Sequence, residues 1–279
     1  NVFLQGCGLA ETLTAADVTG TAQAGGASTI TLHAGASAVD DFYKGMVIQP
    51  TNNSPSGWTN EPDHVIIAYN GTTKVATIER PWTTQPTVAS TFAIRANALY
   101  IPASQGLKNL TIYDYVHHKT AGQDSVLRKL LGAMGNASFT LPNKGLPVAA
   151  FNFMGQFIAP ADIAHPGAVT VDNTKVRVFT GADVYLGSTL IKLNQITLDL
   201  GNQLAQFDDQ SATYGVDVGD ITARLITGRI NPRAGKMSER NVWADFLAGT
   251  ERQLWIRWGT AAGNRQSLLL PEILFQSSE

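Results

Sequence analysis

The chain has a single cysteine, Cys7, among its 279 residues, so no disulfide framework can hold it together. A lone thiol does not indicate a compartment either, and we expect it to behave as a small buried apolar group. No apolar run approaches the roughly twenty residues of a membrane-spanning helix, and no signal peptide opens the chain. These absences predict a protein that is soluble where it is made and has no contact with a membrane.

Charge is also scarce, because charged residues make up 15% of the chain, against about a quarter in typical globular proteins. The formal net charge is −2. A general nucleic-acid binder needs clustered positive charge to displace counterions from phosphates. The composition therefore does not favour that class of protein.

Recognisable catalytic and metal motifs are missing from the sequence. It contains no G-x-S-x-G, H-E-x-x-H or C-x-x-C pattern. Gly235-Lys236 is followed by Met237 where a phosphate loop needs Ser or Thr to bind magnesium. We expect no enzyme activity, no cofactor and no metal, although scattered Asp, Glu and His residues can still meet in space.

Two further groups contain potential metal ligands but lack the spacing of a metal site. His117 and His118 are adjacent, but no Cys or acidic partner lies at ligand spacing, so an ordinary surface pair is the better interpretation. The acidic stretch 208–220 lacks the spacing and the closing Glu of a calcium loop. Its carboxylates are predicted to be solvated.

What the sequence does contain is a strong β-hairpin signal at 127–158. Alternate residues of its second strand form an aromatic set, Phe151, Phe153 and Phe157. The residues between them form a mixed polar set, Asn152, Met154 and Gln156. Side chains alternate between the faces of a strand, so the two sets occupy opposite faces. The segment 142–145 supplies the Pro, Asn and Gly of a tight turn.

Residues 16–97 read as a small all-β domain. Short strands are predicted at 29–32, 45–49, 64–69, 74–79 and 90–95. Asn70-Gly71 lies between two of them and is a strong signal for a hairpin turn, since both central residues of a type I′ turn need positive φ.

The rest of the chain is predicted to be strands with one helix. The strands are expected at 109–116, 175–180, 183–186, 190–207, 221–230, 253–258 and 267–275. The hydrophobic phase of 190–207 switches near Asn194-Gln195, which predicts a bulge or a bend. The helix should be capped by Ser238 and end at Gly249. Its apolar face should pack on a sheet, and comprises Val242, Trp243, Phe246 and Leu247.

Four segments resemble the tail tube proteins of long-tailed bacteriophages. They are 131–139 and 151–155 in the hairpin, 4–9 near the start, and 198–202. The resemblance covers residues 1–15 and about 98–279. Residues 16–97 resemble modules found in phage structural proteins, so we interpret them as an inserted β domain on the outer surface of a tail-tube domain.

The resemblance implies a mainly β fold of two packed antiparallel sheets, as a tail-tube sandwich or barrel, with one flanking helix. It also implies hexameric rings that stack into a hollow tube through which DNA passes. The expected partners are other copies of the chain, the tape-measure protein, tail tip and terminator proteins, and transiently DNA. The expected location is the tail of the virion, after assembly in the host cytoplasm.

Polar residues of 190–207 are candidates for the channel wall: Asn194, Gln195, Thr197, Asp199 and Gln203. Such a wall should be neutral or acidic, because lysine and arginine attract phosphates. Asp199 is the expected carboxylate near the channel. An alternative is that Asp199 caps a turn at Gly201-Asn202.

Two segments supply candidates for contacts between subunits. Residues 1–15 are predicted to be a flexible arm whose Val2, Phe3 and Leu4 either pack on their own subunit or reach a neighbour. Residues 221–238 contain no acid and carry four cations: Arg224, Arg229, Arg233 and Lys236. These either pair with acidic groups of another subunit or are solvated.

Two other functions compete with the tube. A head-associated or decoration protein of a phage would also be β-rich and oligomeric, but would form no tubes. A carbohydrate-binding module would use exposed aromatic rings, for which Trp58 and Trp82 are the candidates.

Overall fold

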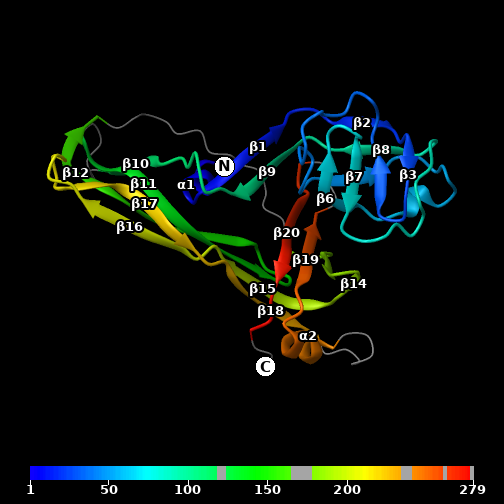
Figure 1. The fold of residues 1–279 in the computed structure, drawn as a ribbon. Helices are drawn as coiled ribbons and strands as arrows, with labels where there is room; N and C mark the ends of the chain where they lie inside the picture. The colour runs from blue at the N-terminus through cyan, green and yellow to red at the C-terminus, as the bar shows by residue number, and fades with distance from the viewer. Residues whose placement is uncertain (118–123, 165–177, 234–240, 260–262, 277–279) are drawn as a thin grey trace. The chain divides into compact units, whose positions relative to one another are not determined.

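The computed structural model describes residues 1–117, 124–164, 178–233, 241–259 and 263–276, and shows a mainly β chain with several antiparallel sheets (Figure 1). This confirms the predicted fold class. The backbone divides into two compact units. Unit 1 comprises Asn1–Glu11, Tyr100–Thr180 and Leu193–Asn231, and unit 2 comprises Thr12–Leu99, Gly181–Lys192 and Pro232–Glu279. No described helix is long and apolar enough to cross a membrane.

Unit 1 is organised around the predicted hairpin. Its strands are β11 (Ser125–Pro142) and β12 (Val148–Ile163), which pair antiparallel along most of their length. On its other side β11 pairs first with β10 (Leu110–Val116) and then with β15 (Leu193–Asp199), beyond which lies β18 (Thr227–Pro232). The predicted hairpin is confirmed.

A second layer of unit 1 is the two-stranded sheet of β16 (Asn202–Asp208) and β17 (Val216–Arg224). It packs closely on the hairpin, because a Cβ on Gly219 of β17 would lie 2.3 Å from the carbonyl oxygen of Met154 in β12. Glycine is therefore needed where the two backbones approach. The polar Gln156 of β12 donates through Nε2 to the carbonyl of Val216 at 3.0 Å.

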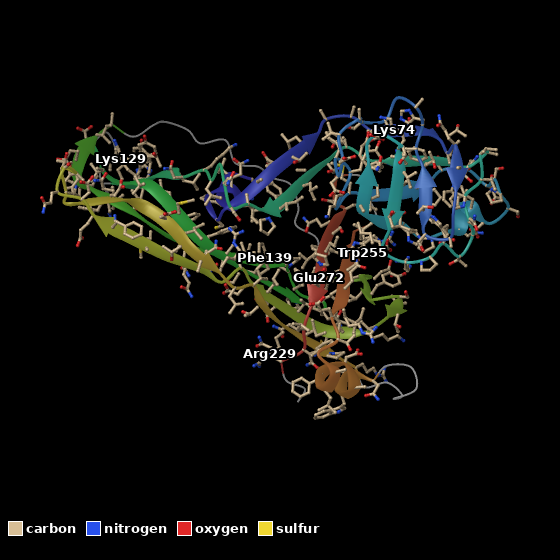
Figure 2. The ribbon with its side chains drawn as sticks, in the orientation of Figure 1. Lys74, Lys129, Phe139, Arg229, Trp255 and Glu272 are labelled. Atoms are coloured by element: carbon tan, nitrogen blue, oxygen red, sulfur yellow. The ribbon has the colours of Figure 1, made fainter. Side chains whose placement is uncertain are left out.

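The aromatic face of the hairpin is covered by the short helix α1 (Val2–Gly6). The ring of Phe3 lies 5.6 Å from Phe151 and 5.8 Å from Phe153, centroid to centroid. Beneath it is a small core of Cys7, Leu9, Ala137 and Leu200, bordered by Leu4, Tyr100 and Phe139. Figure 2 places Phe139 on β11 between the ends of this unit. Phe157 shares the face by parity but is exposed.

The predicted strand 190–207 is wrong as a single element. It is divided among β14 (Thr189–Leu190), β15 and β16, and the sharp change of direction comes at Gly201 rather than at Asn194-Gln195. Gly201 has φ of 61°, and a Cβ there would lie 1.9 Å from the carbonyl oxygen of Leu225. The predicted strand 221–230 breaks at the same place, between β17 and β18, where Leu225 N donates to Gly201 O at 3.2 Å.

Unit 2 contains a seven-stranded sheet formed by residues 18–94. Its order is β2 (Val18–Thr21), β8 (Thr91–Ile94), β5 (Val47–Pro50), β6 (His64–Asn70), β7 (Val75–Ile78), β4 (Thr29–Thr31) and β3 (Ala24–Gly25). A single-turn helix, η1 (Trp58–Asn60), places Trp58 in its core beside Ile30, Ile48 and Phe92. The five strands predicted here match β4 to β8, whereas β2 and β3 were not predicted.

The second sheet of unit 2 comes from distant parts of the chain. Its order is β14, β13 (Asp183–Leu186), β19 (Arg252–Trp258) and β20 (Gln266–Ile273). Two further strands, β1 (Leu9–Thr14) and β9 (Asn97–Pro102), pair with each other at either side of residues 16–97. Of the predicted strand 175–180, residues 178–180 are not in a strand and the others lie outside the described residues.

The predicted helix is α2 (Val242–Ala248), which ends as expected at Gly249 in a left-handed conformation. Its N-cap is Asn241, whose side chain accepts from Ala244 N, whereas Ser238 lies outside the described residues. The predicted packing is wrong: Trp243 is 54% and Leu247 81% exposed. The buried residue of the helix is instead Asp245. Its carboxylate accepts hydrogen bonds from the Arg252 guanidinium, from Nε at 2.9 Å and from Nη2 at 2.5 Å.

The break at Gly201 makes a testable prediction about stability. Gly201→Ala combines an unfavourable φ with a clash against Leu225, whereas Gly215→Ala has φ of 75° and open space around its Cβ. We expect Gly215→Ala to lower the free energy of unfolding by about 1 kcal/mol and Gly201→Ala by roughly 2 kcal/mol more. Urea unfolding of both variants measures this difference, and equal losses would contradict the close approach.

Candidate functional site

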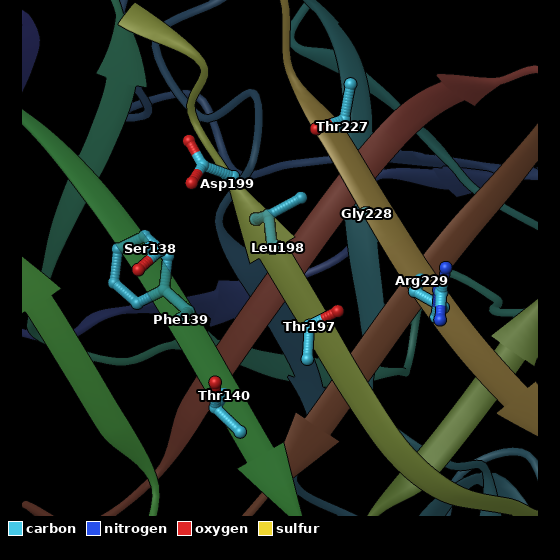
Figure 3. Close-up of a pocket in the computed structure, with 9 residues that line it drawn as sticks. All are labelled: Ser138, Phe139, Thr140, Thr197, Leu198, Asp199, Thr227, Gly228 and Arg229. Carbon is cyan, nitrogen blue, oxygen red and sulfur yellow. The ribbon is translucent and has the colours of Figure 1, made fainter.

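The unit 1 sheet has one face that is polar and open. Ser138 is paired with Asp199, and Thr140 with Thr197, so these four side chains share a face. The alternate residues Ile196 and Leu198 are buried on the other face. A shallow groove of about 390 Å³ follows this surface, as Figure 3 shows. We define the polar face as Ser138, Thr140, Thr197, Asp199, Thr227 and Arg229, which all line the groove.

The two charges of the polar face differ in how they are held. Asp199 Oδ1 accepts from Gly201 N at 2.7 Å and from Asn136 Nδ2 at 2.8 Å. The first of these is the turn-capping contact that was the alternative interpretation of Asp199. Arg229 is exposed and forms no ion pair within the described residues. One acid and one base leave this surface close to neutral.

The five predicted wall residues are only partly brought together. Gln195, Thr197 and Asp199 alternate along β15 and so share the polar face. Asn194 has the parity of the buried Ile196, although it is itself exposed. Gln203 lies on β16, in a different sheet. The sequence analysis grouped them because it treated 190–207 as one strand and gave the turn at Gly201-Asn202 only as an alternative.

The predicted flexible arm is wrong for residues 2–14, which form α1 and β1 and pack on their own chain. Leu4 borders the core, and Val2 and Phe3 are exposed at their outer sides. The start of β1 is anchored to α1, because Gln5 Nε2 donates to Glu11 Oε2 at 2.7 Å. A hydrogen bond from the Tyr100 hydroxyl holds the pKa of Glu11 below its usual value.

The Arg224 side chain forms its hydrogen bonds within its own chain. Its Nε donates to Asn202 Oδ1 at 2.7 Å and its Nη2 to the carbonyl of Gly8 at 2.9 Å. Burial lowers the pKa of this guanidinium and raises the pKa of the neighbouring Cys7 thiol to about 11. The remaining cations of the stretch, Arg229 and Arg233, are exposed, and Lys236 lies outside the described residues.

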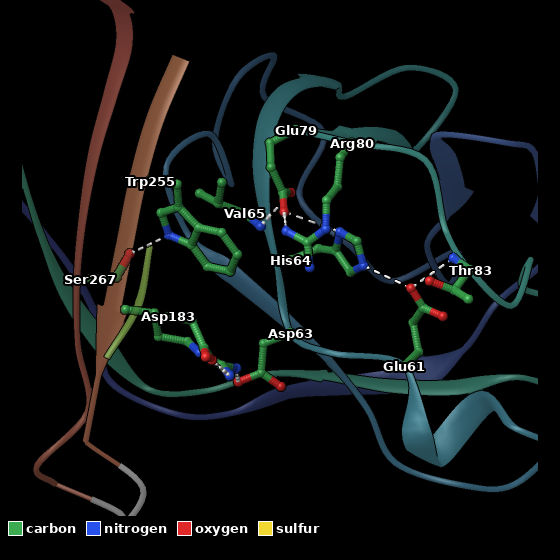
Figure 4. Close-up of polar contacts among 11 residues, drawn as sticks. Glu61, Asp63, His64, Val65, Glu79, Arg80, Thr83, Asp183, Trp255 and Ser267 are labelled. Atoms are coloured by element: carbon green, nitrogen blue, oxygen red, sulfur yellow. Dashed lines mark hydrogen bonds and ion pairs between the residues drawn. The ribbon is translucent and has the colours of Figure 1, made fainter. Parts of the chain in front are cut away.

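Unit 2 holds a buried charge cluster that sequence reasoning missed (Figure 4). His64 lies between two carboxylates, with Nε2 3.0 Å from Glu61 Oε1 and Nδ1 3.1 Å from Glu79 Oε1. The first contact is a hydrogen bond, and the second has the distance of an ion pair without hydrogen-bond geometry. Glu79 also pairs with Arg80.

The carboxylates of this cluster are held by backbone groups as well. Glu61 accepts from Thr83 N at 2.9 Å and Thr84 N at 2.7 Å, and Glu79 accepts from Val65 N at 2.8 Å. Both side chains are about 1% exposed and His64 is fully buried. Because no substrate can reach these groups, we interpret the cluster as structural. No group of three potential metal ligands occurs in the described parts of the chain.

The cluster continues from residues 16–97 into the second sheet of unit 2. The Arg80 guanidinium lies 3.9 Å from the centre of the Tyr185 ring and 5.5 Å from that of Trp255. Arg257 of β19 forms ion pairs with Asp183 at 2.6 Å and with Asp63 at 2.5 Å. Each of these contacts joins residues at least 74 positions apart in the sequence, so no local motif could have indicated them.

The tryptophans proposed for sugar stacking are buried. Trp58 is 0% and Trp82 7% exposed, and their rings pack against each other with centroids 5.0 Å apart. Their indole N–H groups donate to the carbonyls of Thr91 and Thr29. Both side chains are therefore part of the hydrophobic core of the seven-stranded sheet.

Removing one charge from the buried cluster should lower the stability of the folded chain. Glu79→Gln leaves the buried Arg80 without its carboxylate and His64 with that of Glu61 alone, so we expect a loss of about 3 kcal/mol in the free energy of unfolding. The control Glu251→Gln removes an exposed carboxylate and should change it by less than about 0.5 kcal/mol. Chemical denaturation compares the two, and a loss at Glu79 no greater than at Glu251 would contradict the structural role.

Comparison with known families gives a match over nearly the whole chain. A family described as phage tail tube protein matches residues 3–276, a range that also spans residues 16–97. The comparison with curated protein sequences returns no significant match.

Proposed function

Because the chain belongs to the phage tail tube protein family, we propose that it forms hexameric rings that stack into the hollow tube through which phage DNA passes. Membership makes it a structural protein of the virion tail. The ring, its six-fold symmetry and the passage of DNA are the proposal. The observation that carries it is the family match over nearly the whole chain.

The open edges of the unit 1 sheet support association of copies side by side. Its path runs from β12 through β11 and β15 to β18, and within the described residues neither outer edge has a partner strand. β12 is 16 residues long and carries no charged residue before Asp162. Natural sheets usually protect such edges with charges or short strands. Pairing of one copy's β12 with the next copy's β18 would remove both edges as the ring closes.

The polar face supports the assignment of a channel wall. Its hydroxyl groups and balanced charges would let DNA slide, because a wall rich in cations would hold the phosphates. We assign Gln195, Thr197 and Asp199 to this wall. The opposite face cannot serve, since α1 covers it.

The remaining parts of the proposal concern location and partners. Assembly would take place in the host cytoplasm, with the tape-measure protein inside the tube and tip and terminator proteins at its ends. Residues 16–97 would lie outside the wall as an inserted domain. In the structure these residues share unit 2 with Gly181–Lys192 and Pro232–Glu279.

The direct test is electron microscopy of the purified chain at high concentration, with and without tail-tip initiator and tape-measure protein. We expect hollow tubes with a central channel, because joined edges and stacked rings satisfy every open strand. A protein that stays monomeric under all these conditions would contradict the proposal. Capsid-bound caps or trimers without tubes would instead indicate a head-associated protein.

The wall assignment predicts a defect in DNA ejection. Thr197→Lys should place one positive charge per copy in the channel, where each would attract phosphate. Particles should assemble and then eject DNA more slowly, with a larger defect at low salt. Thr72→Lys, on an exposed turn of the inserted segment, is the matched control and should eject normally. Normal ejection from Thr197→Lys particles at low salt would contradict the assignment of β15 to the channel wall.

A further inference from the structure

β11 has a gap on the side that it shares with β10 and β15. Pairing with β10 ends at Ala133, and pairing with β15 begins at Ser138. Buried backbone carbonyls in such a gap need donors from elsewhere. Gly135 lies inside the gap, and its carbonyl accepts from Nδ2 of the Asn202 side chain at 2.8 Å. Asn202 therefore takes the place of a partner strand at this point of β11.

The buried Asn202 amide is bonded at both of its ends. Nδ2 donates to Cys7 O at 2.8 Å as well as to Gly135 O, so both of its hydrogens are used. Oδ1 accepts from Arg224 Nε at 2.7 Å. Exchanging the two ends of the amide would set Oδ1 against two carbonyl oxygens. The partners therefore fix one orientation of this side chain.

The same partners hold the N-terminal segment of the chain. Arg224 Nη2 donates to Gly8 O at 2.9 Å and to Cys7 O at 3.4 Å. A Cβ on Gly8, where φ is 74°, would lie 2.4 Å from this nitrogen. Glycine at position 8 therefore leaves room for the guanidinium. The two carbonyls between α1 and β1 are in this way tied to Asn202 and Arg224.

Asn202 is also connected to the polar face of the sheet, through its backbone. Asn202 N donates to Asn136 Oδ1 at 3.0 Å, and Asn136 Nδ2 donates to Asp199 Oδ1 at 2.8 Å. The orientation of the Asn136 amide is fixed too, because its Oδ1 must face the N–H of Asn202. Asp199 ends this chain of hydrogen bonds and lines the groove of the polar face (Figure 3). We define the Asn202 network as the side chains of Arg224, Asn202, Asn136 and Asp199 with the carbonyls of Cys7 and Gly8.

We propose that Asn202 and Asn136 are positioning residues for the channel wall, which fix the Asp199 carboxylate and make its orientation depend on the docked N-terminal segment. This rests on the proposed function, in which Asp199 belongs to the wall. Repulsion between a carboxylate and a phosphate falls with their distance. A wall therefore repels DNA evenly only if this carboxylate has the same orientation in every copy. The network adds a second bond to the one from Gly201 N and so holds the carboxylate more firmly.

Removing the acceptor at the wall should loosen the N-terminal segment. Asp199→Leu leaves Asn136 Nδ2 without its partner, which weakens the bonds behind it in the network. We expect the backbone amides of residues 2–8 to exchange with deuterium about tenfold faster, as measured by mass spectrometry of the purified chain. Thr197→Leu is the matched control and should leave this exchange unchanged, because Thr197 lies on the same strand and face and is also half-buried.

A conservative variant separates the acceptor from the charge. Asp199→Asn keeps a side-chain oxygen that can accept from Asn136 and from Gly201 N. Exchange of residues 2–8 should therefore stay normal in this variant, although the charge is gone. An increase as large as in Asp199→Leu would contradict the role of Asp199 as an acceptor in the network.

The middle of the network supplies a second pair of variants. Asn136→Leu removes the amide that joins Asn202 to Asp199 and should speed the exchange of residues 2–8 as Asp199→Leu does. Asn152→Leu is its control, because Asn152 is paired with Asn136 on β12 and is exposed. The control should leave the exchange unchanged, and circular dichroism checks the folding of every variant.

The outcomes separate the network from the function on which it rests. Faster exchange in Asp199→Leu and Asn136→Leu, with normal exchange in Asp199→Asn and in both controls, would support the positioning role. Normal exchange in the two leucine variants, or equal increases in their controls, would overturn it while leaving the tube function in place. Absence of tubes from the unchanged chain with its initiator would overturn the channel wall and the positioning role together.

Discussion

The central constraint in unit 1 is that β11 must satisfy backbone groups on both of its sides along 18 residues. It does so with β12 on one side and with β10 and then β15 on the other. Every other feature of the unit follows from that arrangement: α1 covers the apolar face, β17 covers part of the other face, and β12 and β18 become edges. An open sheet of this kind is incomplete alone, because its edge strands retain unpaired N–H and C=O groups.

Alternation of side chains made the hairpin predictable from the sequence. Phe151 and Phe153 pack as their parity indicated, and the turn residues 142–145 lie where they were expected. The same rule failed at 190–207, because a chain that leaves one sheet for another can keep an apolar pattern in both. Gly201 was the available signal, since only a glycine fits against Leu225 with φ of 61°. Its importance depends on a contact between distant residues, which periodicity does not contain.

The candidate site was predictable only in part for a related reason. The polar residues of β15 were identified, but their neighbours Ser138, Thr140 and Arg229 join them through strand pairing alone. Arg224 shows a different error, because the cations of this acid-free stretch were expected either to pair with acidic groups of another subunit or to be solvated. It instead donates to Asn202 and to the carbonyl of Gly8, where burial makes an internal acceptor necessary.

Residues 16–97 show why a segment with its own core need not be independent of the chain around it. Its seven-stranded sheet buries Trp58 and Ile48 in a core whose buried members all lie within this segment, with Leu99 packed against them from just outside it. Yet the Arg80 guanidinium stacks on Tyr185, and Arg257 forms an ion pair with Asp63, so the second sheet of unit 2 supplies partners for two charges of residues 16–97. A buried guanidinium or carboxylate left without its partner is costly. The chain therefore gains a fixed attachment for this segment, which a flexible linker at its two ends could not supply.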